Sequence, residues 1–103
     1  MITVILRIKV SSEKRNELSH ALASLNRGIR TERGCLRSDF YRSAEDENEF
    51  CLLEEWATQS ALKSHMKSER FKVLRGAMNL LKEPCKIVFR TAFQLEGREE
   101  ICL

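Results

Sequence analysis

One of the two histidines in this sequence has the surroundings that a proton-transfer group needs. On a helix that starts at Thr58, His65 lies on the same apolar face as Ala61. Burial there favours the neutral imidazole, and a neutral imidazole beside a cavity is a suitable general base for a phenolic proton. A structural interpretation stays open, in which the ring bonds a strand carbonyl, Glu54 or Glu55 and so fixes the helix to the sheet.

Five other side chains are candidates for contacting a small ligand near this histidine: Trp56, Phe71, Tyr41, Leu74 and Met78. Trp56 ends a predicted strand, can form a pocket wall, and can donate one hydrogen bond from its indole nitrogen. Tyr41 on the preceding strand can donate to a ligand oxygen, although aromatic residues on strands more often only pack. Phe71, Leu74 and Met78 recur at helical spacing, which indicates core packing first and pocket lining second.

Two adjacent carboxylates, Glu54 and Glu55, precede the tryptophan. Successive residues of a strand point to opposite faces of a sheet, so these two do not form a paired-carboxylate catalytic site. We expect one of them to form an ion pair with Arg7, Lys9 or Arg90 on neighbouring strands.

The cysteines offer no metal or redox site. Cys35, Cys51, Cys85 and Cys102 form no Cys-x-x-Cys pair and have no close histidine partner, so the sequence calls for no metal and no other cofactor. We expect free, mostly buried thiols in a reducing cytoplasm. The first apolar run is interrupted at Arg7, so it is expected to be neither a signal peptide nor a membrane span.

Length and charge favour one small globular domain. The chain has 103 residues, of which 43% are apolar, and this suffices for one core. We expect a single domain over 1–103 with a C-terminal tail at 96–103. Eighteen basic and fifteen acidic residues give a net charge of +3 in a mixed pattern, which is not the basic footprint of a nucleic-acid-binding protein.

The pattern of apolar residues predicts the element order β-α-β-β-α-β. Four segments have the composition of strands: 2–10, 35–43, 49–56 and 87–95. The first helix should begin with a cap at Ser11 or Ser12, and Gly34 should supply the left-handed stop that follows it. The second helical region starts near Thr58 and should break near Ser68, whose side chain can cap a new turn.

This order predicts an α+β, ferredoxin-like fold, in which a four-stranded antiparallel sheet carries helices on one face. The first and third strands are then central, and both are apolar on both faces, as with Ile5 and Leu6 or Leu52 and Leu53. Helices cover only one face, and soluble monomers rarely expose large apolar patches. We therefore expect a homodimer in which two sheets pack face to face.

The segment 54–71, EEWATQSALKSHMKSERF, resembles the antibiotic biosynthesis monooxygenase (ABM) family. In that family an acidic residue and a tryptophan end the third strand, and a capped turn leads into Ala-Leu-x-x-His and then Ser-x-x-Phe. Together with the element order, the resemblance covers roughly residues 1–95. It implies a dimeric α+β barrel with one ligand pocket in each subunit, between the helices and the sheet.

The resemblance also implies a function, that of a cofactor-independent monooxygenase acting on a small electron-rich aromatic molecule such as a quinol or phenol. His65 would be the base, and Trp56 and Phe71 would form an aromatic wall that excludes water. Some polyketide-oxidising members carry an asparagine where this chain has Leu52, so the chain departs from their pattern. The alternative is a non-catalytic ligand-binding or stress-related homodimer, since every apolar residue named above also has a packing role.

Two further functions of related folds are set aside. Haem-degrading relatives use a histidine ligand, and the corresponding position here is Arg75. RNA-recognition modules carry a glycine-containing aromatic signature on the third strand, whereas this strand ends in acidic residues and contains no glycine. We expect neither a nucleic acid nor a membrane as partner.

Overall fold

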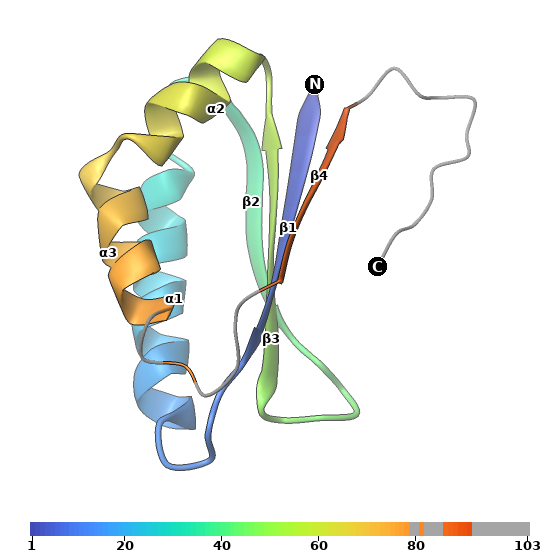
Figure 1. The fold of residues 1–103 in the computed structure, drawn as a ribbon, viewed down its shortest axis with the longest axis vertical. Coiled ribbons are helices and arrows are strands. Elements are labelled where there is room, and N and C mark those ends of the chain that lie inside the picture. The colour runs from blue at the N-terminus through green and yellow to red at the C-terminus, as the bar shows by residue number, and fades with distance from the viewer. Residues whose placement is uncertain (79–80, 82–85, 92–103) are drawn as a thin grey trace.

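The chain forms an antiparallel sheet with helices on one of its faces (Figure 1). The computed structural model describes residues 1–78, 81 and 86–91, so the end of the last predicted strand and the tail at 96–103 lie outside the described residues. The elements follow one another as β1 (Ile2–Lys9), α1 (Arg15–Ile29), β2 (Cys35–Arg42), β3 (Glu49–Trp56), α2 (Gln59–Met66), α3 (Glu69–Met78) and β4 (Lys86–Thr91). The strand order is β2-β3-β1-β4, which confirms that β1 and β3 are central and that the fold is ferredoxin-like.

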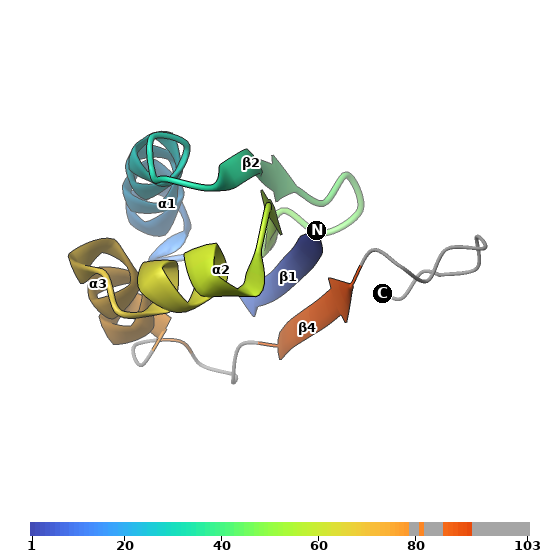
Figure 2. The same cartoon turned by 90° about the horizontal axis from the view of Figure 1, so that it is seen from above.

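The core lies between the sheet and the three helices, which Figure 2 shows on the same side of the sheet. Every second residue of β3 is buried, as expected for a strand with one face on the core. Leu6 on β1 pairs with Leu52 on β3, and Ile8 pairs with Phe50, so the apolar rows of the two central strands are aligned. The helices contribute four buried apolar side chains to this core: Leu22, Ile29, Leu62 and Leu74.

The opposite face of the sheet combines an apolar centre with a charged border. Ile5 on β1 is the register partner of Leu53 on β3, and Ile5 is only 7% exposed. The neighbouring strand β2 presents charged and phenolic side chains on this face, because Arg37, Asp39 and Tyr41 bond one another there. The apolar strip is therefore narrower than the sequence pattern alone indicates.

Helix α1 begins later than the sequence pattern predicts. Neither Ser11 nor Ser12 caps it, because a turn intervenes and the N-cap residue is Lys14, whose side chain makes no capping hydrogen bond. Ser11 instead caps the turn, with its Oγ accepting from the backbone N–H of Lys14 at 3.3 Å. The predicted helix cap at Ser11 or Ser12 is therefore wrong, because the Ser11 side chain bonds the turn that precedes the helix.

The break between α2 and α3 is confirmed at Ser68. Thr58 caps α2, accepting from the N–H of Ala61 at 3.0 Å, and this capping bond fixes the first turn of α2. Ser68 accepts from the N–H of Phe71 at 3.2 Å and donates to the carbonyl of His65 at 2.6 Å. The serine therefore ends one helix and starts the next, which brings His65 and Phe71 to the same bend.

Gly34 sets the path of the loop between α1 and β2. Its φ of 84° lies in the left-handed region that favours glycine, but α1 already ends at Ile29 with its C-cap at Arg30, so the prediction that Gly34 ends this helix is wrong. A Cβ at this position would lie 2.4 Å from the Cβ of Ala61 on α2, and the Gly34 carbonyl accepts from the N–H of Ala57 at 2.8 Å. The loop thus lies directly against α2, and this contact carries Glu32 to the same helix.

A buried polar pair joins α1 to β2, and the sequence pattern did not reveal it. Asn26 is 3% exposed and Ser38 is 1% exposed. The amide of Asn26 donates to the Ser38 carbonyl at 3.2 Å, and the Ser38 hydroxyl donates to the amide oxygen of Asn26. These bonds satisfy the carbonyl and the hydroxyl of Ser38 on the edge strand β2.

We predict that Asn26→Ala lowers the free energy of unfolding by about 1–3 kcal/mol, because it leaves the buried Ser38 hydroxyl without its acceptor. Asn16→Ala on the exposed side of the same helix is the matched control, and it should leave stability unchanged or raise it slightly. Urea unfolding followed by circular dichroism measures both. Equal midpoints for the two variants would contradict the prediction.

Candidate functional site

His65 is the centre of the candidate site. It lies in the last turn of α2, is 2% exposed and faces the sheet. Its ring stacks on Trp56, with 4.5 Å between ring centroids and 26° between planes, and meets the edge of Phe71 at 5.4 Å. The imidazole is therefore enclosed by aromatic rings, as the sequence analysis expected for Trp56 and Phe71.

Glu32, which no sequence motif identifies, is the hydrogen-bond partner of the imidazole at Nδ1. Its Oε1 lies 2.8 Å from Nδ1 of His65, and its Oε2 accepts from Arg70 at 3.3 Å. Arg70 crosses α1 at Gly28, where a Cβ would lie 2.3 Å from the Nε of the arginine. Because a carboxylate accepts at Nδ1, this nitrogen carries the hydrogen, and in the neutral ring the lone pair is then on Nε2.

Glu54 lies on the other side of the imidazole, on β3. It is 1% exposed, and its Oε1 accepts from the indole nitrogen of Trp56 at 2.9 Å. The same Oε1 lies 3.6 Å from Nε2 of His65, which is too long for a hydrogen bond. Burial raises the pKa of the Glu54 carboxyl, against the lowering effects of Trp56 and His65, and nearby Glu32 raises it further.

The expected ion pair of the adjacent carboxylates has a different partner. Glu55 points to the opposite face of the sheet and pairs with Arg37, its register partner on β2, at 3.8 Å. Arg7 pairs with Glu49. The prediction that Glu54 and Glu55 occupy opposite faces, and so do not act as a catalytic pair, agrees with these positions.

A small enclosed cavity of about 40 Å³ adjoins the imidazole. The described residues that line it are Val4, Leu6, Glu54, Leu62, His65, Met66 and Phe71. This volume accommodates water but not an aromatic ring, since a cavity that binds benzene measures about 150 Å³. Met66 lines the cavity and is also 37% exposed, so its flexible side chain separates the cavity from solvent.

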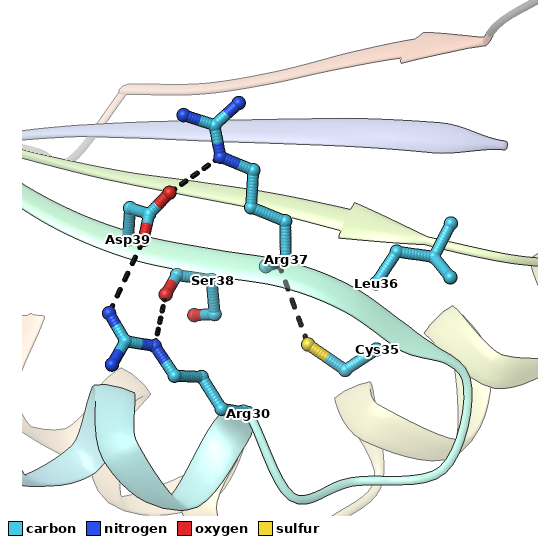
Figure 3. Close-up of a pocket in the computed structure, with 6 residues that line it drawn as sticks. All are labelled: Arg30, Cys35, Leu36, Arg37, Ser38 and Asp39. Carbon is cyan, nitrogen blue, oxygen red and sulfur yellow. Dashed lines mark hydrogen bonds and ion pairs between the residues drawn. The ribbon is translucent and has the colours of Figure 1, made fainter.

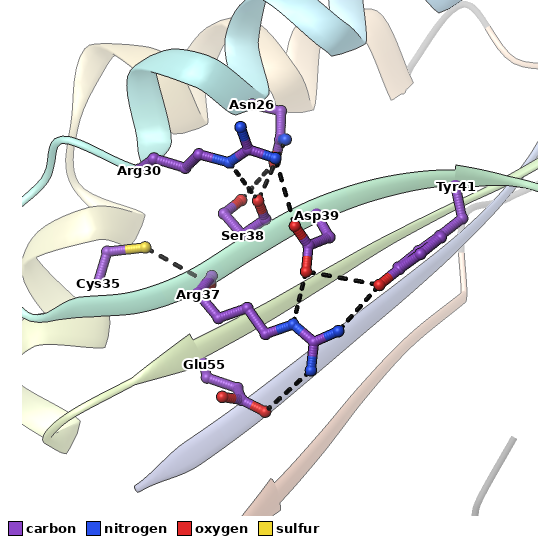
Figure 4. Close-up of polar contacts among 8 residues, drawn as sticks. All are labelled: Asn26, Arg30, Cys35, Arg37, Ser38, Asp39, Tyr41 and Glu55. Atoms are coloured by element: carbon purple, nitrogen blue, oxygen red, sulfur yellow. Dashed lines mark hydrogen bonds and ion pairs between the residues drawn. The ribbon is translucent and has the colours of Figure 1, made fainter.

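The structure brings three of the six proposed site residues together, namely His65, Trp56 and Phe71. Leu74 is buried in the core and Met78 packs against it, and neither is among the described residues that line the cavity. Tyr41 lies on the opposite face of the sheet, where its hydroxyl bonds Arg37 at 2.9 Å (Figure 4).

A second, more open hollow of about 320 Å³ lies along the edge strand β2 (Figure 3). Its charged groups are paired, because Arg30 donates to the Ser38 carbonyl at 2.7 Å and bonds Asp39 at 3.3 Å. Burial raises the pKa of the Cys35 thiol there, which disfavours the reactive thiolate. This hollow therefore lacks the unpaired reactive atoms that distinguish the cavity at His65.

The described residues also bear on the expectations for thiols, haem, metal ions and membrane spans. Cys35 and Cys51 are free thiols, and Cys85 and Cys102 lie outside the described residues. Arg75, at the position that haem-degrading relatives give to a histidine, lies over the ring of Phe71 at 5.5 Å. Within residues 1–78, 81 and 86–91, no group of His, Cys, Asp or Glu side chains is arranged to hold a metal ion. No helix there has the length and apolar character that crossing a membrane requires.

Comparisons with known proteins agree with this arrangement. A family model described as antibiotic biosynthesis monooxygenase matches residues 1–77, which include every residue of the candidate site. The Bacillus subtilis protein called "Putative monooxygenase YcnE" is 34% identical over 90 residues, covering 85% of this chain and 94% of that protein.

Solved structures share the fold. The crystal structure of a Deinococcus radiodurans protein has a TM-score of 0.84 at 20% identity and covers 100% of this chain and 99% of its own. A Mycobacterium tuberculosis protein has a TM-score of 0.82 at 26% identity, with 93% and 98% covered. The arrangement of strands and helices is therefore common to proteins that differ in most of their residues.

We predict that Glu54→Gln makes the protein more stable than wild type, by a margin that grows with pH. The folded-state pKa of Glu54 is raised above its ordinary value of 4.5, so the folded protein holds this proton more tightly than the unfolded chain does. The wild type loses that contribution as pH rises from about 4.5 through the folded-state pKa, whereas glutamine has no proton to lose.

Urea unfolding of both proteins across this pH range measures the difference. Glu55→Gln is the matched control, because that side chain is only half-buried and faces the other side of the sheet. A stability difference between Glu54→Gln and wild type that does not change with pH would contradict the prediction.

Proposed function

This chain belongs to the antibiotic biosynthesis monooxygenase family, and we propose that it is a cofactor-independent monooxygenase acting on a small electron-rich phenol or quinol. The observation that supports the proposal most directly is the orientation of His65. Glu32 holds Nδ1 at 2.8 Å, while Nε2 is buried beside the cavity and has no hydrogen-bond partner among the described residues. An imidazole fixed in this tautomer is ready to accept a proton.

The chemistry follows from proton removal. Nε2 of His65 takes the phenolic proton, and the resulting electron-rich anion passes one electron to O₂. The phenoxyl radical and superoxide combine at a ring carbon into a peroxide, which takes the proton back from His65 and loses water to give a quinone. The substrate supplies all four electrons that reduce O₂, one oxygen atom enters the product and the other leaves as water. Phe71 lines the cavity and, together with Trp56 stacked on the imidazole, keeps solvent from the base.

Substrate entry requires a side chain to move, because the cavity of about 40 Å³ is smaller than an aromatic ring. We propose that Met66 is the side chain that moves. It lies at the end of α2, borders both the cavity and the solvent, and has three rotatable bonds and no hydrogen bond to break. Rotation of this one residue would join the cavity to the surface.

We further propose that the protein works as a cytoplasmic homodimer whose two sheets pack face to face. The support is the apolar strip of Ile5 and Leu53 on the face that carries no helix among the described residues. The bordering charged residues Arg37 and Asp39 are paired with each other at 2.5 Å, which reduces the cost of bringing them near a second copy.

We predict that His65→Ala lowers turnover by about 10²- to 10⁴-fold, the usual contribution of a positioned base. O₂ consumption with a panel of quinols and naphthols measures it, with the spontaneous rate subtracted. His20→Ala is the matched control, since the other histidine of the chain is exposed on α1. Wild-type protein that binds these compounds without consuming O₂ would contradict catalysis and favour the ligand-binding alternative.

We predict that Leu53→Arg converts the dimer to a monomer, because it places a charge in the centre of the apolar strip. Sedimentation equilibrium at micromolar concentration measures the mass. Val73→Arg, on the exposed side of α3, is the control and should leave the mass unchanged. A wild-type protein that sediments as a monomer would contradict the dimer.

A further inference from the structure

Two buried polar atoms at the cavity have no hydrogen-bond partner among the described residues: Nε2 of His65 and Oε2 of Glu54. The two side chains are 2% and 1% exposed, and both line the cavity. Leaving such an atom unpaired costs free energy, so native proteins contain few of them, and each calls for an explanation. The bonds to Glu32 and Trp56 explain the other atoms of these side chains and leave these two unused.

The two atoms have opposite hydrogen-bonding character. Nε2 of His65 is an acceptor, because the hydrogen of the neutral ring is on Nδ1, which bonds Glu32. Oε1 of Glu54 is occupied by the indole N–H of Trp56, so the proton of a neutral carboxyl belongs on Oε2, where it can be donated. Burial favours that neutral form of Glu54 by raising its pKa.

The charged groups around Glu54 come from three elements. His65 on α2 favours the ionised carboxyl only when its ring is protonated, whereas Glu32 in the loop before β2 disfavours it and is itself bonded by Arg70 on α3. Cys35 on β2 is also within electrostatic range of Glu54. The described residues of β1 contribute only aliphatic side chains to this cavity.

We propose that His65 and Glu54 form a two-point recognition site for a substrate with oxygen atoms on adjacent carbons, a hydroxyl beside a second hydroxyl or a carbonyl. The first hydroxyl donates to Nε2 of His65, and the neighbouring oxygen accepts from Oε2 of Glu54. Nε2 lies 3.6 Å from Oε1 of the carboxyl that carries Oε2, and both side chains line the same cavity, so the acceptor and the donor are within reach of neighbouring substituents on one ring. This inference rests on the proposed function and narrows its substrate class to catechols and ortho-hydroxycarbonyl aromatics.

The test compares catechol with resorcinol, isomers that differ only in whether the two hydroxyls are adjacent. Binding to the whole protein is measured by titration calorimetry without oxygen, so that no turnover is needed. We expect catechol to bind about tenfold more tightly, as one additional hydrogen bond to a buried group would give. Equal affinities would overturn the proposal, including the case in which the pair holds only a water molecule.

Variants of Glu54 separate hydrogen-bond donation from charge. Glu54→Gln should keep the preference for catechol, because its amide N–H can donate where Oε2–H did. Glu54→Met, which is similar in size and has no donor, should abolish it. Glu55→Gln on the other face of the sheet is the control and should behave as wild type. A preference that survives in Glu54→Met would overturn the proposal.

The pH dependence provides a second measurement that does not require Glu54→Met to fold. The pair used here is salicylaldehyde and 3-hydroxybenzaldehyde, because a carbonyl can only accept, whereas the second hydroxyl of catechol could also donate to an ionised Glu54. The wild-type preference for salicylaldehyde should fall as pH rises and Glu54 ionises, while the preference of Glu54→Gln should stay constant below the pH at which the ligands ionise. Parallel behaviour of the two proteins would overturn the proposal. Selective catechol binding without O₂ consumption would overturn the catalytic function alone, and turnover with no preference for adjacent oxygens would overturn this inference alone.

Discussion

The site depends on the burial of two titratable side chains, His65 and Glu54, between the sheet and the helices. His65 and Glu54 are almost fully buried, and polar groups in such a position require partners. The protein supplies two of them, Glu32 for Nδ1 and Trp56 for Oε1, and it packs aromatic rings around the imidazole. Among the residues that the structure describes, the buried side-chain atoms left unpaired are the two beside the cavity, where a ligand would bind.

Much of the fold and the centre of the site could be predicted because the relevant signals are local. The alternation of apolar residues in β1 and β3 marks the central strands, and two-residue spacing puts Glu54 and Trp56 on one face. The caps Thr58 and Ser68 fix both ends of α2. Local spacing therefore sufficed to place Trp56, and with it the imidazole above it.

The parts that could not be predicted depend on contacts between distant segments. Glu32 is 33 residues from His65 in sequence and reaches it only because Gly34 lies against α2. Asn26 interrupts an otherwise apolar stripe, and only the approach of β2 explains its burial. Tyr41 could be assigned to one of two faces, but which face carries the helices depends on the register with β3.

The site itself has one part that is fixed by the spacing of the backbone and another that depends on exchangeable side chains. Backbone spacing fixes the contacts among Glu54, Trp56 and His65. The two-residue spacing on β3 places the indole of Trp56 against the carboxyl of Glu54. The helix capped at Thr58 places the imidazole of His65 against the indole. Changing the length of any part would break the stack. The cavity wall at Met66 is not fixed in this way, because its side chain can be exchanged without moving the backbone. The spacing of the motif therefore fixes the arrangement of the site, whereas the choice of substrate would depend on the few atoms that line the cavity.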